Sequence, residues 1–262
     1  MIHNAKYSLT FGWLYPELMS TYGDRGNIIV FQKRCEWRGI GVEIIRLDLG
    51  FKTDDLSKCD LLFMGGSQDK QQQIVMEDLM KKRKFLRNRI ENGIPGLYIC
   101  GAYQFLGKYY KEADGTIIPG LDILDLYTES PGKNSPRLIG NIAIKLNAEI
   151  LNAKYLIHNT NVVGFENHGG RTYLGKQVKP LGKVLKGFGN NGGDLTEGAN
   201  YKNSFGSYLH GPILPKNPEF ADLLIKLALE KKYNSPTSLS PLNDSLEENA
   251  CKSIAKRLDI DL

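Results

Sequence analysis

The chain has 262 residues and a formal net charge of +5, with 41% hydrophobic and 24% charged residues, as in an ordinary globular protein. The longest apolar runs fall far short of the roughly 20 residues that a membrane helix needs, and the first residues lack the layout of a secretory signal. We therefore expect a cytoplasmic protein without a transmembrane segment, and a pI near 8.8 is too mildly basic to indicate nucleic-acid binding.

The first hundred residues alternate between patterns typical of strands and of helices. Apolar and β-branched runs that end in turn residues predict strands at 7–15, 42–49, 60–66 and 96–100. Apolar residues at helical spacing predict helices at 26–39 and 70–92. Continuous apolar strands separated by helices indicate an α/β protein, with a mostly parallel central sheet flanked by helices on both faces.

The second half of the chain is richer in strands, with glycine-rich turns between them. Strands are predicted at 137–146, 161–167, 181–190 and 201–211, and helical spacing follows over 220–228. The Ser/Pro-rich segment 234–244 predicts a linker, and an amphipathic helix is expected at 245–258. The expected organisation is one α/β domain over 1–233, followed by a linker and C-terminal helix over 234–262.

Nothing in the sequence indicates a disulfide framework, a metal site or a bound cofactor. The cysteines form no CxxC pair, so we expect reduced thiols at Cys35, Cys59, Cys100 and Cys251. The chain also has no GxxxxGK[ST] or GxGxxG pattern, and we therefore expect it to bind neither ATP nor NAD itself.

Six Lys or Arg residues gather between positions 81 and 89. The ordinary interpretation of such a run is the solvated face of a helix. The alternative interpretation is attraction to an anionic partner or to a membrane surface.

Cys100 lies where the predicted strand at 96–100 turns into a helix, in the sequence GLYICGAYQFLG. The small residues Gly101 and Ala102 follow it directly, which is the pattern of a nucleophile elbow. A helix N-terminus favours the thiolate, the nucleophilic form of cysteine. A buried cysteine at the end of a core strand is the competing interpretation.

His210 also follows a strand, immediately before Gly211-Pro212. Its imidazole could take the Cys100 proton and later protonate a leaving group, although a surface-loop histidine would show the same pattern. The glycine-rich turn FMGGSQD could place the Gly66 N–H beside that of Gly101 as an oxyanion hole, or it could be a plain turn.

Together these motifs resemble class I glutamine amidotransferases of the cobyric-acid-synthase-like branch. The segments that carry the resemblance occur in the right order: STYGDRGNI, ICGAYQFLG, GFENHGGRTY and YKNSFGSYLHGPILPKN. The resemblance implies a flavodoxin-like fold. It also implies that Cys100 attacks the side-chain amide of glutamine, that His210 shuttles the proton, and that Gly66 and Gly101 hold the oxyanion.

The remaining matches imply contacts with the substrate, and the residues concerned are Gln104, Arg137, Asn167, His168 and Gly169. Arginine suits this task because it can grip a carboxylate through two hydrogen bonds. Many family members carry a glutamate two residues after the histidine, where this chain has Pro212. We therefore hypothesise that an acidic residue of a partner subunit orients His210, with Glu166 and Asp24 as internal alternatives.

The resemblance is strongest to glutaminase subunits that work in a heterodimer with a Mur-ligase-like partner on the peptidoglycan precursor lipid II. It implies that L-glutamine is hydrolysed to glutamate and ammonia through a γ-glutamyl thioester on Cys100. The partner, with ATP and magnesium, would then use the ammonia to convert D-glutamate of lipid II to D-isoglutamine, near the inner face of the membrane. Two alternatives remain open: another cobyrinate- or cobyrate-type amidotransferase, or a cysteine-dependent α/β peptidase-like or non-catalytic binding protein.

Overall fold

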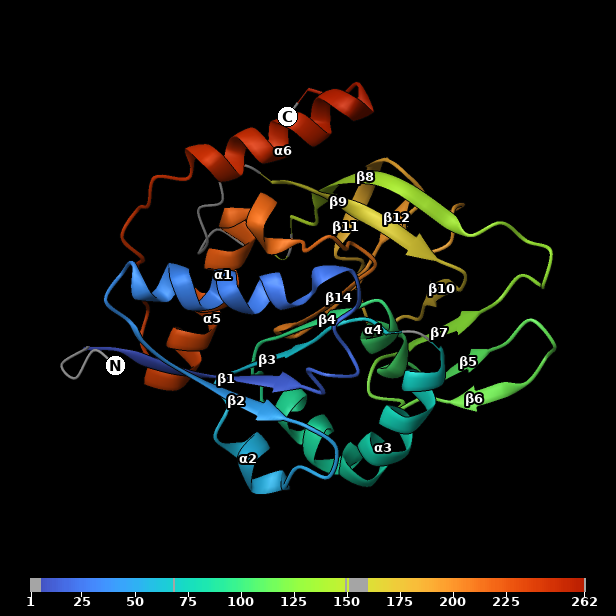
Figure 1. Ribbon diagram of the computed structural model, residues 1–262, viewed down its shortest axis with the longest axis horizontal. Helices are drawn as coiled ribbons and strands as arrows, with labels where there is room; N and C mark the ends of the chain where they lie inside the picture. The colour runs from blue at the N-terminus through green and yellow to red at the C-terminus, as the bar shows by residue number, and fades with distance from the viewer. Residues whose placement is uncertain (1–5, 68, 149, 151–159, 262) are drawn as a thin grey trace.

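A computed structural model describes residues 6–67, 69–148, 150 and 160–261 (Figure 1). The first five residues, part of the segment considered for a signal peptide, lie outside this range. The central sheet has six strands in the order β13-β14-β4-β3-β1-β2, all parallel except β13. Their bounds are β1 (Ser8–Leu14), β2 (Gly41–Leu47), β3 (Leu61–Met64), β4 (Gly96–Ile99), β13 (Ala199–Tyr201) and β14 (Ser204–Ser207).

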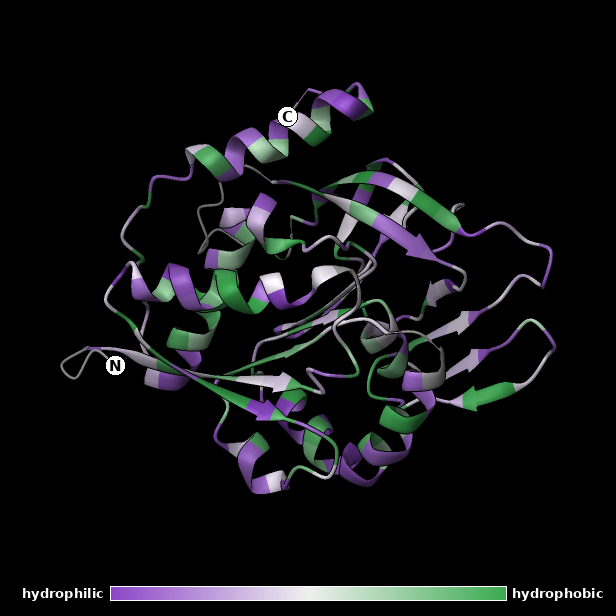
Figure 2. Cartoon of the chain, in the orientation of Figure 1, coloured by the Kyte–Doolittle hydropathy of each residue, from purple (hydrophilic) through white to green (hydrophobic). Residues whose placement is uncertain are grey.

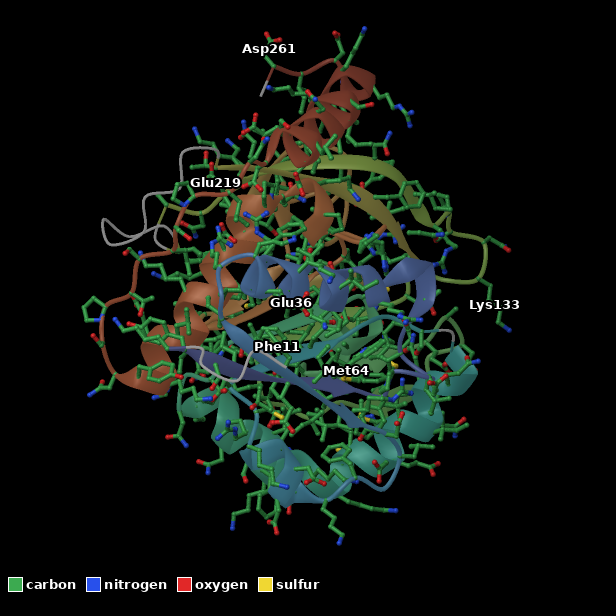
Figure 3. All side chains as sticks on the ribbon, turned by 60° about the vertical axis from the view of Figure 1, so that its left-hand side comes forward. Phe11, Glu36, Met64, Lys133, Glu219 and Asp261 are labelled. Carbon is green, nitrogen blue, oxygen red and sulfur yellow. The ribbon has the colours of Figure 1, made fainter. Side chains whose placement is uncertain are left out.

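Helices cover both faces of this sheet, which confirms the predicted fold class. Strand β3 shows why its sequence is continuously apolar: Leu61 and Phe63 join one core with α1 and α5, whereas Leu62 and Met64 join the other core with α3. Phe11 and Met64 lie deep among the side chains in Figure 3, whereas Lys133 and Asp261 lie at the periphery. The helices concerned are α1 (Arg25–Glu36), α3 (Asp69–Glu91) and α5 (Pro218–Tyr233), and the short α2 (Thr53–Ser57) contacts α3.

Two smaller four-stranded sheets flank the carboxyl ends of the central strands (Figure 1). The first has the order β10-β7-β5-β6, with β5 (Tyr109–Lys111), β6 (Ile117–Pro119), β7 (Leu126–Glu129) and β10 (Arg171–Leu174). The second has the order β12-β11-β8-β9, with β8 (Leu138–Leu146), β9 (Asn161–His168), β11 (Gly182–Lys186) and β12 (Thr196–Glu197). The sequence did not predict the first of these sheets.

The predicted strand at 201–211 is wrong in extent. The chain reverses after β13 at Lys202, whose φ is 53°, and returns as β14. The predicted strand at 181–190 ends at Lys186, because the next residue, Gly187, has a φ of 112°.

The C-terminal helix α6 (Ser245–Leu258) packs on the outer face of β8 and β9, where Cys251 lies with Ala143 and Val163 in a small core. Figure 2 shows hydrophobic and hydrophilic residues interspersed along α6, as expected of a helix with one buried side. Arg34 of α1 pairs with Asp244, the residue before α6, at 2.6 Å, and so ties this segment to the domain.

The basic run at 81–89 forms part of α3. Lys82 pairs with Asp78, and Arg83 and Arg87 both pair with Asp122. These intramolecular partners favour the interpretation as an ordinary solvated helix face. Within the described part of the chain, no helix is both long and apolar enough to cross a membrane.

Candidate active site

The carboxyl ends of three adjacent parallel strands bring Gly66, Cys100 and His210 together. Gly66 follows β3, Cys100 follows β4, and His210 follows β14 after a short extended stretch. In open α/β sheets this edge is where ligands bind. The parallel topology therefore gathers three sequence motifs that lie far apart in the chain.

Cys100 occupies a strained turn between β4 and the five-residue helix α4 (Gly101–Phe105), with φ 53° and ψ −108°. Its backbone N–H donates to the Ser207 carbonyl at 2.8 Å, and its carbonyl accepts from the Gln104 N–H at 3.0 Å. Such backbone strain costs about 1–3 kcal/mol and persists only where the surroundings enforce it. The side chain is partly exposed, unlike those of the other three cysteines, which are buried.

Gly66 lies close to both reactive side chains. A Cβ atom on Gly66 would lie 3.1 Å from Cβ of Cys100 and 3.1 Å from Cε1 of His210. Both distances are tighter than ordinary contacts, so a larger residue would push the cysteine and the histidine apart. Glycine at this position is thus a requirement for their close approach.

His210 is held by a two-way backbone pair with Phe165 of β9, and its side chain is 1% exposed. Burial lowers the pKa of His210, but the adjacent Cys100 side chain and the Asp24 carboxylate outweigh it and raise the pKa to about 10. At neutral pH the imidazole is therefore protonated, which suits an ion pair with a Cys100 thiolate.

Of the two internal acids predicted as alternatives, Asp24 lies beside His210. Its Oδ1 is 3.9 Å from His210 Nδ1, and its side chain is fully buried. Glu166 instead accepts hydrogen bonds from the N–H groups of Phe188 and Gly189, with His168 at 3.7 Å. The structure therefore separates Glu166 from the cysteine–histidine pair.

The Gly66 N–H group is not open to a substrate oxygen in this structure. It donates to Asp24 Oδ2 at 2.7 Å, because a buried carboxylate needs hydrogen-bond donors. The oxyanion role of Gly66 stays a prediction, and in this structure its N–H is taken by Asp24, whereas Gly101 begins helix α4 directly after Cys100.

The predicted substrate contacts gather at the loop between β9 and β10. Arg137, just before β8, donates to the side-chain and main-chain oxygens of Asn167, both at 2.9 Å. A Cβ atom added to Gly169 would lie 3.3 Å from Nη1 of Arg137. His168 is buried, and its Nδ1 bonds the Gly170 carbonyl at 2.8 Å. It therefore lies behind this loop rather than at its surface.

Several residues that fix the site were not predicted from the sequence. Asn27 accepts from the Leu214 N–H, and Asn217 bonds both backbone groups of Val163, so both hold the segment after His210. Tyr208 hydrogen-bonds Gln104. The alternation of side chains along extended backbone could have pointed to Tyr208, since it is two residues before His210.

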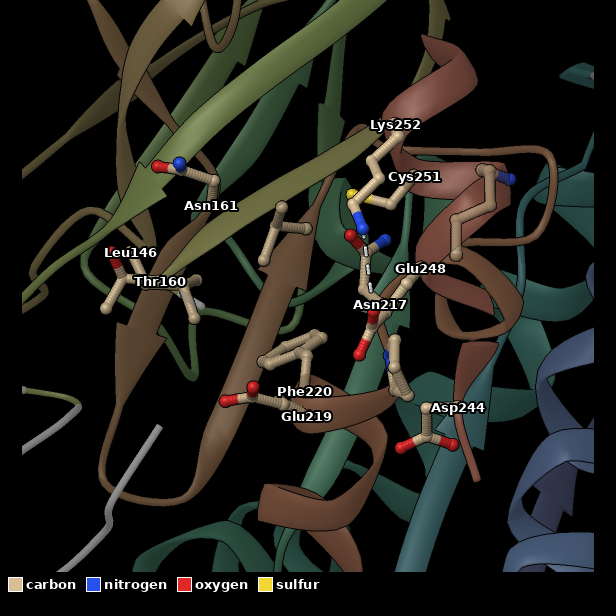
Figure 4. Close-up of a pocket in the computed structure, with 13 residues that line it drawn as sticks. Leu146, Thr160, Asn161, Asn217, Glu219, Phe220, Asp244, Glu248, Cys251 and Lys252 are labelled. Atoms are coloured by element: carbon tan, nitrogen blue, oxygen red, sulfur yellow. Dashed lines mark ion pairs between the residues drawn. The ribbon is translucent and has the colours of Figure 1, made fainter. Parts of the chain in front are cut away.

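A cavity of about 460 Å³ lies away from Cys100 and His210, between α5, α6 and the edge of β9 (Figure 4). Asn161, Asn217 and Lys252 are among its lining residues, but Cys100 and His210 are not. Among the described residues, no three His, Cys, Asp or Glu side chains are grouped closely enough to hold a metal ion.

A strained cysteine and a buried histidine at the carboxyl edge of a parallel sheet define a class of cysteine-dependent α/β enzymes. Residues 10–218 match the CobB/CobQ-like glutamine amidotransferase domain, and the chain belongs to this family. A crystal structure described as a glutamine amidotransferase has the same fold, with a TM-score of 0.53, 17% identity, and coverage of 83% of this chain and 98% of that one.

Two relatives are similar to this chain over most of its length, and both are described as "Lipid II isoglutaminyl synthase (glutamine-hydrolyzing) subunit GatD". The protein of Staphylococcus aureus strain N315 is 42% identical over 228 residues, which is 86% of each chain. The protein of Streptococcus pneumoniae strain R6 is 42% identical over 247 residues, covering 94% of this chain and 90% of the relative.

Proposed function

We propose that this chain is the glutamine-hydrolysing subunit of a lipid II isoglutaminyl synthase. The observation that carries the proposal is the close approach of Cys100 and His210 beside Gly66. The 42% identity to the two glutamine-hydrolysing subunits, over most of both chains, supports the choice of substrate and pathway.

In the proposed reaction, the Cys100 thiolate attacks the side-chain carbonyl carbon of L-glutamine. Protonated His210 gives its proton to the amide nitrogen, the carbon–nitrogen bond breaks, and ammonia leaves a γ-glutamyl thioester. Water then attacks the thioester and passes a proton to His210. Glutamate leaves, and the cysteine–histidine pair is restored.

The oxyanion of each tetrahedral intermediate needs preorganised donors. We assign this role to the Gly101 N–H at the start of α4, since Asp24 occupies the Gly66 N–H. Gly66 would contribute a second donor only after its bond to Asp24 breaks. Arg137 is the proposed partner of the substrate carboxylate, and its guanidinium is already oriented by Asn167.

Asp24 is proposed as the acid that orients His210, because its Oδ1 faces Nδ1 of the imidazole. An internal acid is a simpler explanation of how His210 is oriented than an acid from the partner subunit. The two can be separated experimentally, since an acid on the partner would make Asp24 dispensable in the complex.

The remaining reaction belongs to the partner. We propose a Mur-ligase-like (MurT-like) subunit that binds ATP and magnesium, activates the D-glutamate α-carboxylate of lipid II and receives the ammonia. The heterodimer would work in the cytoplasm at the inner face of the membrane. A cobyrinate- or cobyrate-type acceptor has weaker support, because the two relatives similar along most of this chain are described as lipid II enzymes.

The test is glutamate release from L-glutamine by the chain with its partner present, and formation of a thioester trapped with hydroxylamine. Cys100→Ala should abolish both signals. Turnover that survives this substitution would rule out the proposed nucleophile, and ammonia-dependent amidation of a cobyrinic acid instead of lipid II would redirect the proposal to the alternative acceptor.

A further inference from the structure

Tyr208 lies between helix α4, which follows Cys100, and the loop between β9 and β10 that is proposed to bind glutamine. Its side chain is fully buried two residues before His210. Burial holds the pKa of its phenol well above the ordinary value, so the hydroxyl stays protonated and can both donate and accept. None of the catalytic steps above uses this residue.

The Tyr208 hydroxyl is the centre of a buried chain of hydrogen bonds. It accepts from Gln104 Nε2 at 3.0 Å and bonds Thr172 Oγ1 at 2.6 Å, and Thr172 in turn bonds Thr128 at 2.7 Å. The two threonines are directly paired across β7 and β10. The Gln104 amide is therefore anchored to a rigid sheet through one phenol.

The other end of the Gln104 amide is left available. No hydrogen bond reaches its Oε1 from any residue within the described ranges, although the residue is only 9% exposed. Gly170 lies against the amide, and a Cβ there would be 2.9 Å from Gln104 Nε2. Because Gly170 has no side chain, the loop between β9 and β10 can pack directly against the Gln104 amide.

The Tyr208 ring positions the same loop from the other side. It stacks on the imidazole of His168 with ring centroids 3.7 Å apart and planes 4° from parallel. Burial lowers the pKa of His168, so the ring is neutral, and its Nδ1–H donates to the Gly170 carbonyl. One side chain therefore fixes both Gln104 and the segment that carries Asn167 and Gly169.

We propose that Tyr208 is a positioning residue for substrate binding: it aims Gln104 Oε1, an acceptor, at an N–H donor of the bound amino-acid substrate. The inference rests on the proposed glutaminase function, and Tyr208 acts through Gln104 without touching the reacting atoms. Its loss should therefore weaken substrate binding more than it slows the chemical steps.

Tyr208→Phe removes the hydroxyl and keeps the ring that stacks on His168. We expect the KM for glutamine to rise about tenfold, the effect of one well-placed hydrogen bond, while kcat stays within about threefold. Tyr103→Phe is the matched control, because it removes another buried phenol hydroxyl, bonded to Asn190, from the same region. Its KM should remain that of the wild type.

Two further measurements separate positioning from a merely structural role. In a Gln104→Ala background, Tyr208→Phe should have almost no additional effect on KM, since the amide that it holds is gone. Alkylation of Cys100 by iodoacetamide should keep its rate, whereas alkylation by the glutamine analogue 6-diazo-5-oxo-L-norleucine should slow. Thr172→Val, which removes the anchor of the phenol, should raise KM in the same direction if Tyr208→Phe proves too unstable to assay.

The complex of the chain with its partner is the protein to assay. An unchanged KM in Tyr208→Phe, or equal KM increases in the Tyr208→Phe and Tyr103→Phe variants, would overturn the inference about Tyr208. Glutamine turnover by the wild type would still support the proposed function in that case. Wild-type protein that hydrolyses no glutamine would defeat the proposed function first.

Discussion

Asp24 and His210 face each other in the buried interior of the site, with Oδ1 of the acid 3.9 Å from Nδ1 of the imidazole. The second oxygen of Asp24 accepts a hydrogen bond from the Gly66 N–H. One carboxylate therefore lies beside both His210, the proposed general acid–base, and the glycine-rich turn after β3. This chain has Pro212 two residues after His210, and a different segment of the chain places the carboxylate of Asp24 beside the imidazole.

Replacing this carboxylate tests its role. Asp24→Asn keeps an acceptor for the Gly66 N–H but removes the negative charge that helps raise the His210 pKa. We expect kcat to fall about 10- to 1,000-fold, less than the roughly 10⁴-fold loss known for a directly bonded triad aspartate. Steady-state kinetics of the complex give the value.

The comparison variant is Glu166→Gln, which alters the second acid hypothesised from the sequence but leaves the contacts of His210 with Cys100 and Asp24 intact. Its His210 pKa should match the wild type. Full activity of Asp24→Asn in the complex would show that the orienting acid comes from the partner instead.

The His210 pKa provides a second prediction. Because the cysteine is the largest cause that raises it towards 10, Cys100→Ala should lower it markedly. Protonated His210 stabilises the fold fully below its unfolded pKa of 6.5, and that stabilisation is lost as the pH rises through about 10. In Cys100→Ala this stabilisation should be smaller, and its loss should be complete at a lower pH.

An NMR titration that follows the His210 Cε1 proton checks this directly. The chain has four histidines, and the signal that disappears in a His210→Gln variant identifies His210. An unchanged His210 pKa in Cys100→Ala would mean that the two side chains do not form an ion pair.

The strained backbone at Cys100 is expected to lower the stability of the folded protein. Alanine keeps the cost of φ 53° and ψ −108°, whereas glycine adopts positive φ without a Cβ clash. Cys100→Gly should therefore be about 1–2 kcal/mol more stable than Cys100→Ala in urea unfolding, although both are inactive. Equal stabilities would show that the turn carries little strain.

Strand β4, strand β3 and the elbow could be predicted because each depends on local sequence. Their continuous apolar runs require burial on both faces, and small residues after Cys100 permit the turn. The sequence named Asp24 as one of three possible sources of the acid beside His210, but it could not choose among them, since the choice depends on how the segment after β1 packs against β3. The small sheet of β5, β6, β7 and β10 was missed because its strands have only three or four residues.

Buried Glu197 predicts a pH-dependent stability. Burial raises its pKa from 4.5 to about 7, although Ser207 and the Tyr208 N–H both donate to it. The folded state binds this proton more tightly than the unfolded chain, so stability should fall by roughly 3 kcal/mol as the pH rises from 4.5 through 7.

Glu197→Gln keeps an acceptor for both donors and has no charge to bury, so it should lack this loss and be more stable than the wild type at pH 8. The free energies of unfolding of the wild type and Glu197→Gln, measured in urea at pH 5 and pH 8, test this prediction. The same pH dependence in both proteins would show that another group is responsible.

Cys100 and His210 are proposed to hydrolyse glutamine for a partner synthetase. The most direct measurement is ammonia and glutamate release from L-glutamine by the chain, with and without the Mur-ligase-like subunit, for wild type and Cys100→Ala. We predict turnover that rises when the partner is added and disappears in Cys100→Ala. Wild-type protein that releases no glutamate under either condition, with Cys100 reduced, would rule out glutamine hydrolysis by this chain and favour a peptidase-like or binding function.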